Sequence, residues 1–281
     1  MRSSVVLAAI IALLASCVPQ LVANDKAKTV ETEAKPADPG PGWGSLPFQF
    51  IYDGEAPEPE VITPVRGAEL CGKFKIIDEG LLVDKKTRGL ANVVVTLNHK
   101  RKELPEALPE IVQNLAKIKV QMTNKACRFE PHVGTVWTEQ TLELGNKDPD
   151  VHNMLFNLLY NIPFNEVIPP NSTATKTLKL AEKLPRPVSC SIHPFMQGWI
   201  VVKDHPYAAV SGNTGEATIA HLPVGEWEFQ LWHEKVGYLS DITLNGKPAT
   251  GTKGVYTWKI GSGTNERLKI ELNPKLFQPE K

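Results

Sequence analysis

A succession of short β-rich segments, separated by Gly, Pro, Asn and Asp, constrains the fold of this chain more than any other feature. The segments begin near Leu46 and recur until Leu272. Short runs of β-branched and aromatic residues between turn signals are typical of strands, and their close spacing is typical of β-sandwiches. Helical periodicity is scarce: residues 104–116 are the best candidate, and two prolines limit them to a turn or two. We therefore predict an all-β fold built from β-sandwiches.

Size and charge limit the function classes. A chain of 281 residues with 42% hydrophobic content can hold one large or two modest domains with a packed core. Acidic and basic residues are balanced at 31 each, so nothing predicts nucleic acid or an acidic membrane surface as the partner.

The N-terminus has the pattern of an export signal. Residues 1–23 carry Arg2, an apolar run that is too short to span a bilayer, and then small residues. The letters "LASC" look like a bacterial lipobox, which would make a lipidated Cys17 the first mature residue and provide membrane attachment; the alternative is ordinary cleavage a few residues later. Either way we expect an exported protein, periplasmic or membrane-anchored on the outer side. Residues 24–42 have almost nothing to bury and are expected to be a disordered linker.

The stretch "PVSCSIHPFMQGWIVV" contains three potential metal ligands. It places Cys190, His193 and Met196 three residues apart, but Pro194 argues against a helix, so we expect a loop that closes into a strand over residues 198–203. A loop at the end of a strand can turn three unlike donors toward one point.

A fourth donor lies upstream. The segment "LGNKDPDVHNMLFN" places His152 after a polar turn. Two imidazoles and a thiolate, with a weak axial thioether, are the donor set of a mononuclear blue-copper electron-transfer site. Methionine is a poor ligand for zinc and no second cysteine is near, so zinc is a distant second choice. A c-type haem would need a Cys-x-x-Cys-His motif, which the sequence lacks. Core packing of Cys190 and Met196, with the histidines at the surface, is the remaining alternative.

Two motifs in this region, "DPDVHN" and "CSIHPFM", resemble the copper-ligand motifs of the cupredoxins, and the spacing of the second is similar to the short ligand loop of amicyanin, tighter than in plastocyanin. The resemblance covers residues 117–204 and implies a Greek-key cupredoxin domain. It implies one type 1 copper site with the ligands His152, Cys190, His193 and Met196. It also implies that Asn153 and Ser191 tie the ligand loop to the upstream strand.

The flanking segments resemble a second fold. Residues 214–238 and 89–98 look like strands of a carboxypeptidase-regulatory-like β-sandwich, and the wider sequence looks like exported bacterial methylamine-utilisation-like proteins. We expect residues 43–116 to form the first part of this flanking sandwich, residues 205–273 to form its remaining strands, and residues 274–281 to be a tail. The copper domain would then be inserted into one sandwich or packed between its halves; the alternative is an independent C-terminal domain.

The sequence contains two further cysteines, Cys71 and Cys127, and two histidines, His132 and His205, that flank the predicted copper domain. With Cys17 processed and Cys190 reserved for chemistry, Cys71 and Cys127 are left as a pair in an oxidising compartment, which favours a disulfide over two buried free thiols. His132 and His205 flank the copper domain and could form a second metal site, although a hydrogen-bonded structural role is the preferred interpretation of each.

These observations predict an electron carrier rather than an enzyme. The sequence has no His-x-His pair of the kind that assembles a trinuclear copper cluster. We expect a redox protein, a cytochrome or a dehydrogenase, as partner. Electrons would leave through His193, and Pro194, Phe195 and Trp199 would line the docking surface. The alternative is a copper-storage, copper-delivery or structural interaction protein without an electron-transfer role.

Overall fold

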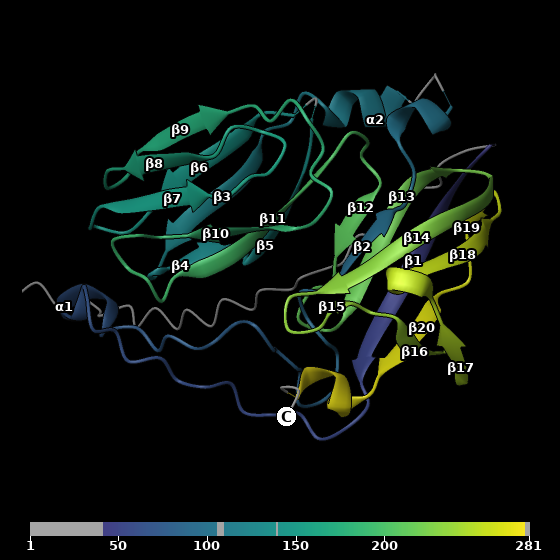
Figure 1. The fold of residues 1–281 in the computed structure, drawn as a ribbon, viewed down its shortest axis with the longest axis horizontal. Coiled ribbons are helices and arrows are strands. Elements are labelled where there is room, and N and C mark those ends of the chain that lie inside the picture. Colours follow the sequence, from purple (N-terminus) through teal and green to yellow (C-terminus); the bar gives the residue numbers. More distant parts are fainter. Residues whose placement is uncertain (1–41, 106–109, 139, 279–281) are drawn as a thin grey trace, which may run out of the picture. The chain divides into compact units, whose positions relative to one another are not determined.

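The computed structural model describes residues 42–105, 110–138 and 140–278 (Figure 1). The predicted signal peptide, the lipobox with Cys17 and all but the last residue of the predicted linker lie outside the described residues. Among the residues that are described, no helix has the length and apolar character needed to cross a membrane.

The described chain is nearly all β-structure, which confirms the predicted fold class. Its helical elements are short, and they are α1 (Ala68–Cys71), α2 (Glu110–Leu115) and the 3₁₀ turns Arg101–Glu103, Thr252–Gly254 and Pro274–Phe277. The helix α2 is the part of the predicted helical segment that follows its second proline, in agreement with the limit set by the two prolines.

One β-sandwich, called the site sandwich below, is built from nine strands in the middle of the chain. Its five-stranded sheet runs in the order β5 (Val133–Trp137), β11 (Gln197–Lys203), β10 (Arg186–Ser189), β7 (His152–Phe156) and β8 (Phe164–Ile168). Its four-stranded sheet runs in the order β4 (Arg128–Glu130), β3 (Val120–Lys125), β6 (Leu142–Asn146) and β9 (Thr173–Lys176). Fully buried Met122, Leu144, Phe156 and Ile200 lie in the core between these sheets.

The second β-sandwich, called the flanking sandwich, combines both ends of the described chain. One sheet has the order β13 (Glu216–Pro223), β1 (Trp43–Tyr52), β20 (Leu268–Leu272), β16 (Asp241–Leu244) and β17 (Lys247–Thr250), with β19 (Gly263–Thr264) also paired to β1. The other has the order β12 (Ala208–Val210), β2 (Val94–Leu97), β14 (Gly225–His233) and β15 (Gly237–Tyr238), with β18 (Val255–Ile260) paired to β14.

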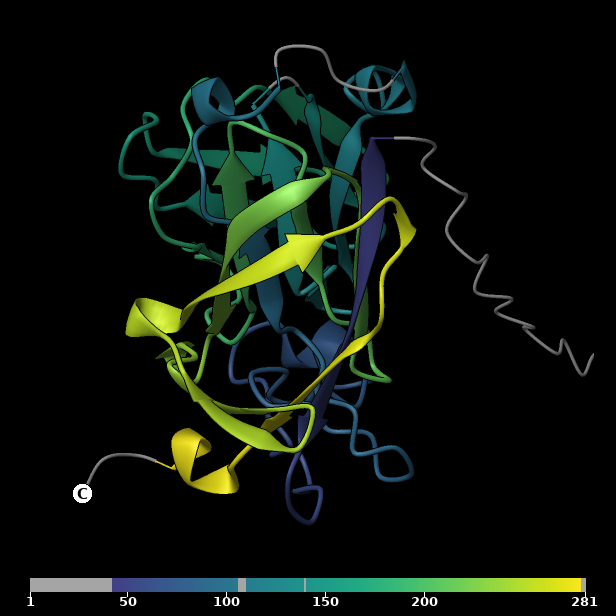
Figure 2. The ribbon, with the colours of Figure 1, turned by 90° about the vertical axis from the view of Figure 1, so that its right-hand side faces the viewer.

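The pairing of β1 brings distant parts of the chain together. It runs antiparallel to β13 and parallel to β20, and Figure 2 shows β1 in purple among the C-terminal strands. The chain therefore begins the flanking sandwich with β1 and β2, passes through the site sandwich, and returns to complete the flanking sandwich. The exact domain boundaries given above stay a prediction.

Strand β11 shows why its sequence is a continuous apolar run. Ile200 and Val202 face the core of the site sandwich, whereas Val201 belongs to a small cluster that also includes Val94 and Trp232 of the flanking sandwich. Because both faces of β11 are covered by protein, the usual alternation of apolar and polar residues is lost.

Candidate metal centre

Two strand ends bring the predicted ligands together. Strand β7 begins at His152, and β10, which pairs with β7, ends one residue before Cys190. The loop that follows is closed by two backbone hydrogen bonds: the Met196 N–H donates to the His193 carbonyl (2.9 Å), and the Cys190 N–H donates to the Met196 carbonyl (3.2 Å). As the sequence predicted, the segment is a loop that leads into β11.

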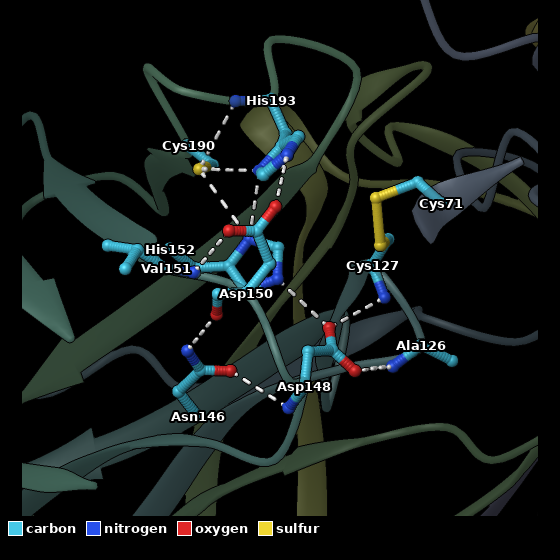
Figure 3. The surroundings of a disulfide bond; sticks show 10 residues. All are labelled: Cys71, Ala126, Cys127, Asn146, Asp148, Asp150, Val151, His152, Cys190 and His193. Carbon is cyan, nitrogen blue, oxygen red and sulfur yellow. Dashed lines mark hydrogen bonds and ion pairs between the residues drawn. A yellow bond between two sulfur atoms is a disulfide. The ribbon is translucent and has the colours of Figure 1, made fainter. Parts of the chain in front are cut away.

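Three donor atoms converge at this point (Figure 3). The Nδ1 atoms of His152 and His193 lie 3.0 Å apart, and Cys190 Sγ lies 4.0 and 3.8 Å from them, respectively. A first-row metal ion bound at about 2.0–2.3 Å from each atom requires separations of about 3–4 Å between neighbouring ligand atoms. The arrangement therefore fits one ion, and each of the three residues is at most 1% exposed. Met196 is also buried and shares the core cluster of Cys190.

A buried carboxylate orients His152. Asp148, which is 4% exposed, lies 3.0 Å from the outer ring nitrogen, Nε2, so that Nδ1 is left to face Cys190 and His193. Carboxylates commonly hold metal-ligating histidines in this way. The motif "DPDVHN" contained the signal, an aspartate four residues before the histidine, but the sequence analysis did not identify this role.

Asp148 is itself held by the tight turn between β3 and β4. It accepts the backbone N–H groups of Ala126 (2.6 Å) and Cys127 (2.9 Å), which join β3 to β4 and both have positive φ. Asn146 also supports the loop, since its side chain accepts the Asp148 N–H (2.9 Å) and donates to the Asp150 carbonyl (2.7 Å).

Asn153 connects β7 to the ligand loop. Its Oδ1 accepts the Ile192 N–H (3.2 Å) and lies 3.3 Å from Cys190 Sγ, and its Nδ2 donates to Ser191 Oγ (3.3 Å). The structure thus brings Asn153 and Ser191 into the contact that the resemblance implied.

Burial and hydrogen bonds shift the pKa values of the three donor residues. Burial raises the pKa of Cys190, but hydrogen bonds with His152, Asn153 and His193 outweigh burial and lower the pKa. Burial lowers the pKa of His152, but its bonds with Asp148 and Cys190 raise the pKa to about 9. Burial and the charge of His152 lower the pKa of His193. The pKa of Cys190 is thus lowered while that of His152 is raised, and a bound cation would compete with the protons of both residues.

No protein-family model and no curated protein matches the chain. Among solved structures, the Cu-containing nitrite reductase from Thermus scotoductus SA-01 aligns at 22% identity and TM-score 0.28 over 30% of this chain. The novel purple cupredoxin from Nitrosopumilus maritimus aligns at 16% identity and TM-score 0.26 over 31% of this chain and its own full length. A Cu(I) form of an amicyanin variant aligns at 20% identity and TM-score 0.28 over 39% of this chain and 98% of its own.

The aligned region spans only 22% of the nitrite reductase chain. Likenesses with TM-scores this low carry no argument about function, so the proposal below rests on the side chains of the site.

The surroundings of His193 differ from the expectation. We expected its ring to lead electrons to a docking surface, but its side chain is 2% exposed and Gly67 lies against its outer edge. Trp199 is also placed differently: its ring packs on Trp232 of the flanking sandwich (5.0 Å between centroids) and its Nε1 donates to Glu234 (3.0 Å). Of the three residues predicted to line the docking surface, Pro194 is exposed and Phe195 is half-buried.

The structure joins Cys71 and Cys127 by a disulfide, with their Cα atoms 5.6 Å apart (Figure 3). Cys190 is the one free cysteine among the residues described. Because Cys127 also donates its backbone N–H to Asp148, the disulfide is connected to the predicted ligand His152 through one carboxylate.

His132 and His205, the two histidines considered for a second metal site, have separate, hydrogen-bonded positions. His132 places Nε2 2.5 Å from Glu234 and Nδ1 3.8 Å from Glu79. His205 is buried, and its Nδ1 accepts the N–H of Tyr207 (3.2 Å). Within the described ranges neither belongs to a group of three potential metal ligands, so the possible second site built from both has no support in the geometry.

Proposed function

We propose that this protein is an exported electron carrier with one type 1 copper site. The observation that carries the proposal is the buried triangle of His152 Nδ1, His193 Nδ1 and Cys190 Sγ, which matches the ligand separations of a single ion. Two imidazoles and one thiolate suit copper, and the cupredoxin resemblance of "DPDVHN" and "CSIHPFM" adds Met196 as a weak axial ligand.

The protein's own groups prepare this site. Asp148 fixes the ring of His152, and Asn153 fixes the loop that carries Cys190 and His193. The backbone N–H of His193 donates to Cys190 Sγ (3.4 Å), which stabilises the negative sulfur. Copper would supply a one-electron couple between Cu(II) and Cu(I). Ligands that are already positioned in a buried, hydrogen-bonded frame need little rearrangement when the charge changes.

A carrier is favoured over an enzyme by the burial of the donors. The three donor residues are 0–1% exposed, so a substrate has no direct approach to the ion. Burial equally argues against rapid copper delivery, because the ion would have to leave through packed protein.

The setting of the site remains part of the proposal. We propose a periplasmic or outer-side membrane-anchored location, attachment through a lipidated Cys17, and a cytochrome or dehydrogenase as redox partner. The flanking sandwich is proposed to be carboxypeptidase-regulatory-like, with the copper domain at residues 117–204.

The test separates electron transfer from storage or delivery. The copper-loaded mature protein should give a reversible one-electron wave in voltammetry and should retain copper for hours against a Cu(I)-selective chelator. An irreversible wave together with copper loss within minutes would favour the delivery alternative.

A further inference from the structure

The segment from Pro64 to Cys71, called the cover below, lies against the candidate metal centre although it is far from the ligands in sequence. At its middle, Gly67 has a φ of +68°, and a Cβ added there would lie 2.3 Å from His193 Nε2 and 2.6 Å from Cδ2. Backbone at this position therefore touches the outer edge of the ring, and only glycine combines this contact with a positive φ.

The cover is a compact turn with a covalent anchor. The N–H groups of Leu70 (3.1 Å) and Cys71 (2.8 Å) donate to the Gly67 carbonyl, so the glycine and the cysteine move together. Cys71 is fully buried and bonded to Cys127. On the other side of Gly67, Pro64 is buried and Val65 is 93% exposed.

The other attachments of the cover are non-covalent. The backbone pairs at the base of the segment, where the Ile62 N–H donates to the Ile76 carbonyl (2.9 Å). Leu70 packs against the core of the site sandwich. The disulfide adds a covalent restraint to these contacts and helps to hold Gly67 against His193.

We propose that Gly67 and the Cys71–Cys127 disulfide position a closed cover that excludes water and small anions from His193. The inference rests on the proposed function and extends it, because a shielded histidine restricts the site to electron transfer and prevents an external ligand from binding. Loss of the Cys71–Cys127 cross-link would release the cover. The ring of His193 then becomes accessible from the Gly67 side.

Chemical modification tests the cover without copper. The metal-free mature protein is treated with diethyl pyrocarbonate, and modified histidines are located by mass spectrometry. His193 should stay unmodified in the wild type and become modified at least tenfold faster in the double variant C71S/C127S. His99, whose side chain is 24% exposed, is the internal control and should react equally in both proteins.

A second variant leaves the disulfide in place. The methyl group of Gly67→Ala would clash with the His193 ring and should displace the cover. The reactivity of His193 should then rise while Cys71 and Cys127 stay bonded. Gly246→Ala is the matched control: Gly246 has a φ of +78°, so it has the same backbone strain, but nothing lies within 4 Å of its added Cβ. This control should leave His193 protected. If C71S/C127S fails to fold by circular dichroism, the comparison of these two alanine variants decides.

Azide added to the Cu(II) proteins provides the copper-dependent measurement. The electron-spin-resonance spectrum should change in Gly67→Ala and stay unchanged in the wild type and Gly246→Ala. Rapid modification of His193 in the wild type, or equal protection in the wild type and Gly67→Ala, would overturn the cover. Absence of an intense visible band in the copper-loaded wild type would instead overturn the proposed function, whereas the modification result would stand.

Discussion

At the scale of the residue, Asp148 determines which nitrogen of His152 faces Cys190 and His193. The carboxylate is bonded to Nε2 and is itself fixed by two backbone N–H groups, so the imidazole has one orientation before any ion binds. Hydrogen-bonding partners of this kind typically contribute a factor of about 10–100 to metal affinity.

Replacing Asp148 with Ala should therefore weaken Cu(II) binding by about 10–100-fold, because His152 loses its orientation. Competition with a chelator of known affinity measures the loss. Asp150→Ala is the control on the same loop, since Asp150 is half exposed and lies 4.0 Å from His193 as a distant ion pair. Equal losses in both variants would contradict the specific role of Asp148.

Met196 differs from the other predicted ligands in softness. A thioether favours Cu(I), whereas the amide oxygen of glutamine favours Cu(II), so Met196→Gln should lower the reduction potential and keep the site coloured. Voltammetry of the wild type and the variant measures the shift. A higher potential in Met196→Gln would show that the thioether is not the axial ligand.

At the scale of the element, the ligand loop was predictable because its information is local. Pro194 excludes a helix, and the β-branched run after it requires a strand, so the sequence indicated both the loop and β11. The cover was not predictable. Gly67 is separated from His193 by more than a hundred residues, and a single glycine in an irregular segment gives no sign of what its backbone touches.

The turn between β3 and β4 was also not predictable from the sequence. Ala126 and Cys127 both have positive φ, which costs about 1 kcal/mol or more for each non-glycine residue. Their N–H groups both bond to Asp148, and this pairing offsets the strain. Such a turn is normally recognised by Asn-Gly or Asp-Gly, and neither pair is present here.

The disulfide contributes to stability as well as to the cover. Cys71 and Cys127 are 56 residues apart, and on the chain-entropy model a loop of this length stabilises the fold by about 4 kcal/mol. C71S/C127S should therefore unfold at a lower urea concentration than the wild type. Coincident urea transitions for the two proteins would show that the cross-link does not restrain the unfolded chain.

At the scale of the whole described structure, His132 joins three parts of the chain. Its ring lies in the site sandwich, Glu234 is in the flanking sandwich, and Glu79 belongs to the segment between β1 and β2. Asp78 adds a third carboxylate, while Arg128 and Lys235 are bonded to Glu79 and Asp78 (2.8 Å each). Burial lowers the pKa of His132, but Glu234 and the other carboxylates outweigh burial and raise the pKa above 6.5.

The raised pKa predicts how stability depends on pH. A group with a higher pKa in the folded state stabilises the fold fully below its unfolded pKa, and this contribution is lost as the pH rises through the folded pKa. The wild type should therefore exceed His132→Gln in free energy of unfolding most clearly below about pH 6, with a smaller difference at higher pH. Urea titrations from about pH 5 to 9 measure the difference in free energy of unfolding between the two proteins. His99→Gln is the control, since His99 pairs with Glu103 instead. A difference that grows with pH would contradict the assignment.

The central claim is that Cys190, His152 and His193 bind one copper ion as a type 1 site. The most direct measurement is the visible absorption and electron-spin-resonance spectrum of the oxidised, copper-loaded protein, recorded beside Cys190→Ser. Thiolate-to-copper charge transfer should give the wild type an intense visible band and a small copper hyperfine splitting, and the band should vanish in the variant while the β-sheet circular dichroism remains. A wild type without the intense band, or a Cys190→Ser variant that keeps it, would contradict the account.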